Sequence, residues 1–262
     1  MWNLFKSKSV LSDEDIYFQI ECYKWLLTHF GGDEFYKEVQ LVLPTEDFFP
    51  DIVDSKSEAI ITTFEQVKKY AGMSDWPCTL ESQEEDPNLV VSPTVVIKNV
   101  ENNPLGTFSV NENDEVVITY NPSLSSNPVQ MVATFAHELS HYLTSSASTP
   151  PPGGWDNWEF ATDICATFLG FGVFTANAAF NFQQYTGVDS QGWQTSGGGY
   201  LSEAEYSYSL AIFLHLKGIS PEYVYVHCDQ NIKNYLKKAY SELEHGSIIK
   251  QLQEVVYVPR NT

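Results

Sequence analysis

Residues 127–145 read N-P-V-Q-M-V-A-T-F-A-H-E-L-S-H-Y-L-T-S. Asn127 followed by Pro128 is a helix start signal, because the Asn side chain can cap free backbone N–H groups and proline suits the first helical position. Five apolar residues then follow at helical spacing on one face: Val129, Val132, Ala136, Leu139 and Leu143. The stretch therefore predicts an amphipathic helix from Pro128 to about Ser145, with one face packed on the core.

The chain before this helix is predicted to hold two helices and a small sheet. Helices are expected over residues 13–30 and from about 55 to 70, because a polar start signal precedes each and glycine follows each. Short runs rich in β-branched residues predict strands at 41–43, 90–91, 95–97, 106–110 and 116–120. Residues 111–114, N-E-N-D, separate the last two runs and are typical of a hairpin turn.

The chain after this helix is predicted to be helical. Residues 146–154 contain three consecutive prolines and predict a loop, and 183–199 are rich in Gln and Gly and predict a second one. Helices are expected over about 156–180, 201–216 and 229–244, with a short one after Pro221. The predicted fold class is α+β, with a small antiparallel or mixed sheet in residues 1–125 and a mainly helical part in 126–262. The two parts are expected to form one compact unit.

Charge and composition exclude several classes of partner. The 262 residues include 34 acidic and 14 basic ones, a net charge of −20, so a nucleic acid or an anionic membrane is not an expected partner. Residues 164–180 are the longest apolar stretch, but they are too short and too interrupted for a membrane span and predict a buried helix. The four cysteines form no C-x-x-C pair and no signal peptide precedes the first helix, which predicts reduced thiols and a cytoplasmic protein.

The helix at 128–145 carries an H-E-x-x-H motif at His137, Glu138 and His141. Two His residues four apart project from one helical face about 6 Å apart, which suits two imidazoles on one zinc ion. Glu138 can then hold and deprotonate a zinc-bound water. The alternative is an ordinary amphipathic helix with two solvated His residues.

A catalytic zinc site also needs a third protein ligand and one open position. The metzincin extension of the motif would require Gly at position 144 and His at 147, but Thr144 and Ala147 stand there. The remaining candidate is a carboxylate from the next helix, where Glu159 and Asp163 share one face. Glu159 has a competing role, because it could close a capping box at the start of its own helix.

His137-Glu138-x-x-His141 followed by Glu159-x-x-x-Asp163 resembles the gluzincins, the thermolysin-like zinc peptidases. The resemblance covers about residues 116–174, and the gap between His141 and Glu159 is a residue or two shorter than in the best-known members. It implies a zincin-like active-site helix, Glu159 as the third zinc ligand, and Asp163 as the acceptor of the other N–H of His137. It also implies that the strand at 116–120 edges the cleft and pairs with the substrate backbone; an ordinary sheet strand is the alternative.

The resulting prediction is a zinc-dependent hydrolase that cleaves peptide bonds in a peptide or protein substrate, with Glu138 as general base. A peptidase of this kind needs a donor for the developing oxyanion, and related enzymes use a downstream Tyr or His. Tyr208 is the preferred candidate, on a helical face shared with Glu205 and His215, although most helical tyrosines simply pack. Two rivals remain: a zinc-binding protein without catalysis, and an interaction protein without metal.

Overall fold

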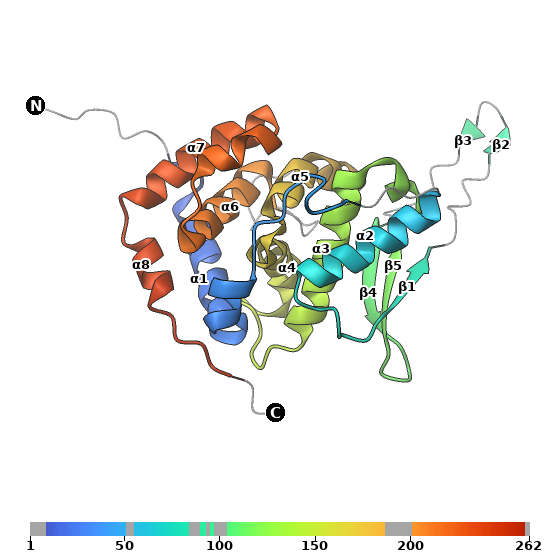
Figure 1. The fold of residues 1–262 in the computed structure, drawn as a ribbon, viewed down its shortest axis with the longest axis horizontal. Helices are drawn as coiled ribbons and strands as arrows, with labels where there is room; N and C mark the ends of the chain where they lie inside the picture. The colour runs from blue at the N-terminus through green and yellow to red at the C-terminus, as the bar shows by residue number, and fades with distance from the viewer. Residues whose placement is uncertain are drawn as a thin grey trace, which may run out of the picture.

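The computed structural model describes residues 9–50, 55–83, 90–92, 95–96, 104–186 and 201–259. Figure 1 shows the sheet and α2 (Lys56–Tyr70) at one end of the molecule and α1 (Asp13–Phe30), α6 (Glu203–Lys217), α7 (Gln230–Glu244) and α8 (Ile248–Gln253) at the other. Between them lies α3 (Pro128–Ser145), which packs against α2, the sheet, and the helices α4 (Trp158–Ala166) and α5 (Gly172–Thr186). One continuous hydrophobic core joins residues from both ends.

The sheet has the strand order β1-β5-β4, with β1 (Thr79–Ser82) parallel to β5 (Val116–Tyr120) and β5 antiparallel to β4 (Gly106–Val110). It is therefore a mixed sheet, as the fold class predicts. β5 is its central strand, so the expectation that 116–120 edges the cleft is wrong. β1 pairs in parallel with one side of β5, and β4 pairs with the other side. Among the described strands β4 is therefore an edge strand, and it is the one beside the cleft.

The hairpin between β4 and β5 confirms the predicted strands and turn. Asn111 Oδ1 accepts the backbone N–H groups of Asn113 and Glu115 at 2.9 and 3.0 Å, and Asp114 takes the left-handed conformation with φ 61°. β2 (Val90–Ser92) and β3 (Val95–Val96) form a separate antiparallel pair, and Ile97 lies outside the described residues. β1 was not predicted, since its sequence T-L-E-S contains a single apolar residue.

The polar start signal before residue 13 and the Asn127-Pro128 signal begin helices as the sequence predicts, whereas the cap at Ser202 was not predicted. Asn127 Oδ1 accepts the backbone N–H of Gln130 at 3.1 Å at the start of α3. Ser202 and Glu205 form a capping box that begins α6, and Gly218 ends that helix at φ 64°. Short helical turns fill several connections: η1 (Glu34–Glu38), η2 (Pro122–Ser126), η3 (Trp155–Asn157), η5 (Pro221–Tyr223) and η6 (Tyr225–His227). α8 was not predicted.

The single helix predicted over 156–180 is wrong, because the chain bends within it. α4 ends at Ala166, the π-helical turn η4 (Thr167–Phe171) follows, and α5 continues to Thr186. Gly170 within the turn has φ 98°, and a Cβ there would lie 2.1 Å from the carbonyl oxygen of Gln40. The strand predicted at 41–43 is also wrong: this buried segment pairs with none of the described strands, and Val42 N–H donates to Gly170 O at 2.9 Å.

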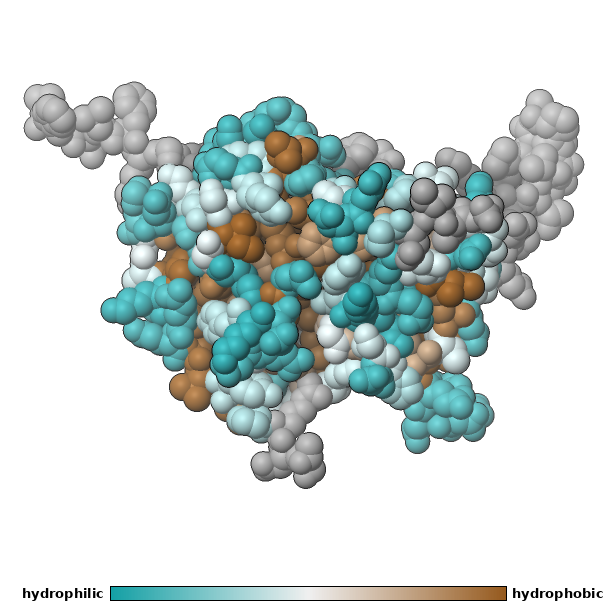
Figure 2. Space-filling model, viewed as in Figure 1, coloured by the Kyte–Doolittle hydropathy of each residue, from teal (hydrophilic) through white to brown (hydrophobic). Residues whose placement is uncertain are grey.

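The apolar helical stretch belongs to the core. Residues Trp155–Ala179 are long and apolar enough to cross a membrane by length and composition, but 94% of their most apolar part is buried inside the molecule. This burial is typical of a core helix, and the face in Figure 2 mixes hydrophilic with hydrophobic residues. All four cysteines are free. The cytoplasmic location stays a prediction.

Candidate metal centre

Two packed helices supply the site. α3 carries His137, Glu138 and His141, and α4 carries Glu159 and Asp163. The Pro-rich loop between them is fixed to the helix α1, because Trp25 Nε1 donates to Thr149 O at 3.1 Å. The loop that connects α3 to α4 is therefore held against α1.

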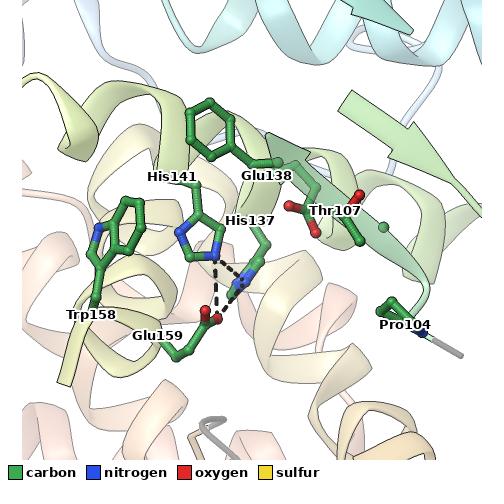
Figure 3. Close-up of a pocket in the computed structure, with 9 residues that line it drawn as sticks. Pro104, Thr107, His137, Glu138, His141, Trp158 and Glu159 are labelled. Atoms are coloured by element: carbon green, nitrogen blue, oxygen red, sulfur yellow. Dashed lines mark hydrogen bonds and ion pairs between the residues drawn. The ribbon is translucent and has the colours of Figure 1, made fainter. Parts of the chain in front are cut away.

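Three potential ligand atoms meet at one point in Figure 3. His137 Nε2 lies 3.1 Å from His141 Nε2, and Glu159 Oε2 lies 3.3 and 3.2 Å from these two nitrogens. Four-coordinate tetrahedral metal sites have ligand bonds of about 2.0–2.1 Å, which places neighbouring ligand atoms about 3.3 Å apart. The observed triangle has nearly this size, so His137, His141 and Glu159 form a group that can hold a metal ion.

The hydrogen bonds on the far side of each imidazole orient its inner nitrogen toward the other members of the metal-binding group. His137 Nδ1 lies 2.8 Å from Asp163 Oδ1, and the other Asp163 oxygen accepts Leu201 N–H at 2.9 Å. When a neutral His137 donates from Nδ1 to the Asp163 carboxylate, its Nε2 carries the lone pair that a cation would bind. His141 Nδ1 has Thr162 Oγ1 at 3.2 Å in the equivalent position. Asp163 is thus buried and in contact with His137, and its role behind a metal ligand stays a prediction.

Glu159 faces the histidines and does not cap its own helix. Asn157, the N-cap residue of α4, makes no side-chain cap bond, and the Glu159 side chain is 47% exposed. Partial burial acts to raise the pKa of Glu159, but hydrogen bonds with His137 and His141 outweigh it and hold this pKa well below its usual value. The capping alternative is therefore wrong, and Glu159 has the charge that a metal ligand needs.

Glu138 lies beside this group and is 4% exposed. Burial raises its pKa, an effect that the nearby His137 and His141 only partly offset. The carboxylate fits because residue 106 of β4 is a glycine: a Cβ at Gly106 would lie 2.9 Å from Glu138 Oε1. A buried carboxylate next to the metal-binding group can act as a proton acceptor and donor.

A pocket of about 280 Å³ opens over the metal-binding group. Its lining combines α3 and α4 with the edge strand: Pro104, Gly106, Thr107, Phe108, His137, Glu138, His141, Trp158 and Glu159. The Phe108 ring is stacked on His141 at a centroid distance of 6.1 Å, and Trp158 meets His141 edge-on at 4.7 Å. Gly106, Phe108 and Trp158 were not predicted as site residues, because their place at the site depends on the strand order and on helix packing.

Tyr208 is not among the residues that line the pocket. Its side chain is buried within α6, and burial, together with the charge of Glu242 on α7, raises the pKa of its hydroxyl. His215 Nε2 contacts Tyr240 O at 2.9 Å. The role of Tyr208 as oxyanion donor stays a prediction that no contact of the described residues supports, and residues 187–200 lie outside the description.

Neither a family model, nor a curated protein, nor a solved structure matches this chain. Any function must therefore come from the chemistry of the site itself.

Proposed function

We propose that this protein is a zinc-dependent hydrolase of the gluzincin type that cleaves peptide bonds. The supporting observation is that His137, His141 and Glu159 bring three ligand atoms together in one pocket, directly beside the buried carboxylate of Glu138. The proposal includes a peptide or protein substrate.

The ligand set favours zinc. Two imidazole nitrogens and one carboxylate oxygen suit zinc, whereas magnesium and calcium prefer oxygen ligands alone. Three protein ligands leave a fourth tetrahedral position for water or substrate, which is typical of catalytic zinc sites. When bound, zinc would polarise a peptide carbonyl and lower the pKa of a bound water.

Glu138 takes the proton of the attacking water and passes it to the leaving amine. His137 is held in one tautomer and one orientation by Asp163, and His141 is oriented by Thr162. Phe108 and Trp158 pack around His141 and keep water away from that side of the group.

The edge strand β4 offers a place for the substrate backbone. Leu105 O accepts Asn121 N–H and Asn111 N–H donates to Glu115 O, so the odd-numbered residues of β4 pair with β5. The N–H and C=O groups of Gly106 and Phe108 then point to the open edge of the described sheet, at the pocket. A peptide can add there as a further strand. N-methylation of substrate amides beside the scissile bond would then raise KM.

Three variants test the proposal. Glu138→Gln should keep one equivalent of zinc and lose peptide hydrolysis, because it retains the shape of the side chain but cannot take the proton. His141→Ala should lose both zinc and activity. Glu254→Gln, an exposed matched control, should change neither. Metal analysis and cleavage of a peptide library, read by mass spectrometry, give the result.

Each part of the proposal can fail separately. Protein purified without chelator that holds no zinc, and takes up none at neutral pH, would rule out a zinc enzyme. Zinc binding with no cleavage in the library, in the wild type as in Glu138→Gln, would favour a zinc-binding protein without catalysis.

A further inference from the structure

Two polar residues on α3 lie on the same helical face as Glu138 and have no hydrogen-bond partner within the described residues. Gln130, Thr134 and Glu138 are spaced four apart and are 3%, 1% and 4% exposed. Both polar atoms of the Gln130 amide and the hydroxyl of Thr134 are unpartnered. Three buried polar atoms without partners in one row need an explanation, because such groups are normally bound to protein or to ordered water.

Thr134 differs in this respect from the other hydroxyl residues of the same helix. Ser140 Oγ donates to Ala136 O, and Thr144 Oγ1 donates to Ser140 O, each at 2.7 Å. These are the usual contacts of a buried hydroxyl in a helix. Thr134 makes no such bond, so its hydroxyl is available to another group on that face of the helix.

Gly106 connects Thr134 to the active-site carboxylate. A Cβ at Gly106 would lie 2.8 Å from Thr134 Cγ2 and 2.9 Å from Glu138 Oε1, so both side chains abut the same glycine. Thr134 stands one helical turn before Glu138, whereas His141 stands on the other side of it. Neither Gln130 nor Thr134 lines the pocket. Gln130 and Thr134 therefore lie along α3 on the side of Glu138 that faces away from the pocket.

We infer that Gln130 and Thr134 hold ordered water that hydrogen-bonds to the Glu138 carboxylate, and that both are positioning residues for the proposed reaction. Buried water typically makes about three hydrogen bonds to polar groups that lack partners. The amide of Gln130 supplies both donors and an acceptor, and the hydroxyl of Thr134 supplies one of each. Such water would fix the orientation of this largely buried carboxylate, and a fixed orientation is what proton transfer in a defined direction requires.

The inference rests on the proposed function for its kinetic consequence but not for the water itself. A high-resolution crystal structure of the zinc-loaded protein should show at least one water within hydrogen-bond distance of Thr134 Oγ1, and a water on Glu138. A dry gap, or a direct bond of both residues to protein atoms, would overturn the inference whether or not the protein hydrolyses peptides.

Kinetics and stability test the role. Thr134→Val, which keeps the shape and removes the hydroxyl, should lower kcat about tenfold with KM and zinc content unchanged. Thr134→Ser should restore kcat. Gln130→Met should act like Thr134→Val. The opposite result, unchanged kcat together with a higher unfolding free energy in Thr134→Val, is the outcome expected of a dry pocket and would refute the role.

Thr175→Val is the matched control. Thr175 is equally buried on α5, and its hydroxyl donates to Gly172 O at 3.3 Å within its own helix. This variant should lose some stability and keep its kcat. An equal loss of kcat in Thr175→Val and Thr134→Val would mean that general destabilisation, rather than water at Glu138, lowers the rate. If the wild type cleaves no peptide, the proposed function fails, and the crystallographic waters alone decide this inference.

Discussion

Nδ1 of His137 and Oδ1 of Asp163 lie 2.8 Å apart, and this buried contact joins α3 to α4 directly behind the metal-binding group. The second oxygen of Asp163 accepts the backbone N–H of Leu201, just before α6 begins. One carboxylate therefore orients the imidazole of His137 and also holds the backbone of Leu201, which leads into α6. A shift in the packing of these helices would move His137 Nε2 with respect to His141 and Glu159.

Asp163→Asn should weaken zinc binding about 10- to 100-fold, which is the usual cost of removing a hydrogen-bond partner behind a metal-binding His. The amide would have to present its NH₂ group either to His137 or to Leu201 N–H, and both positions need an acceptor. Competition with a fluorescent chelator measures the change. Asp156→Asn, an exposed neighbour, serves as control and should leave the affinity unchanged. Equal affinities of wild type and Asp163→Asn would show that the contact does not orient the ligand.

Removal of zinc should lower the melting temperature by about 10 °C when the wild type is compared at a free zinc concentration near 1,000 times Kd. The reason is that only the folded chain brings the three ligand atoms within 3.3 Å of each other, so bound zinc stabilises the folded state over the unfolded one. Thermal unfolding with and without chelator gives the shift. Magnesium should not restore it. Glu159→Ala should unfold at the same temperature with and without zinc, and a full zinc-dependent shift in this variant would mean that Glu159 is not a ligand.

The sequence predicts the parts of this fold that depend on neighbouring residues. Asn127-Pro128 sets the start of α3, and N-E-N-D sets the hairpin between β4 and β5; both are as expected. The spacing of the H-E-x-x-H motif puts His137 and His141 on one face of α3, and the spacing of Glu159 and Asp163 puts both carboxylates on the face of α4 that meets them. Helical periodicity fixes which residues share a face.

The parts that could not be predicted depend on contacts between distant segments. The bend at Gly170 is set by the carbonyl of Gln40, about 130 positions away in the chain. The central position of β5 results from its parallel pairing with β1, whose own sequence barely resembles a strand. Phe108 lines the pocket from β4 and Trp158 lines it from α4, so their contribution also depends on strand pairing and helix packing. The place of an oxyanion donor depends on the same kind of long-range packing, and Tyr208 does not line the pocket.

Gly106→Ala should lower peptide hydrolysis about tenfold or more while leaving zinc bound, because the added methyl group would overlap Glu138 Oε1 and Thr134 Cγ2. The metal-binding atoms of His137, His141 and Glu159 are not among the atoms that this methyl group meets. Measurement of kcat/KM and zinc content on the same samples separates the two effects. Gly246→Ala is the matched control, since its Cβ would meet nothing closer than 3.8 Å. Unchanged kcat/KM in Gly106→Ala would mean that Glu138 does not need its present position.

Gly170→Ala should be among the most destabilising single substitutions in this protein, with a loss of roughly 3 kcal/mol or more in the free energy of unfolding. The backbone at φ 98° is strained for any residue with a side chain, and the Cβ would also lie 2.1 Å from Gln40 O. Gly218→Ala isolates the first effect, because φ there is 64° and a Cβ would meet no atom within 4 Å; its loss should be about 1 kcal/mol. Urea unfolding of both variants gives the comparison. If the two losses are equal, the close approach of residues 40 and 170 does not shape the junction between α4 and α5. Because α4 carries Glu159 and Asp163, Gly170→Ala protein that remains folded should also bind zinc more weakly than Gly218→Ala.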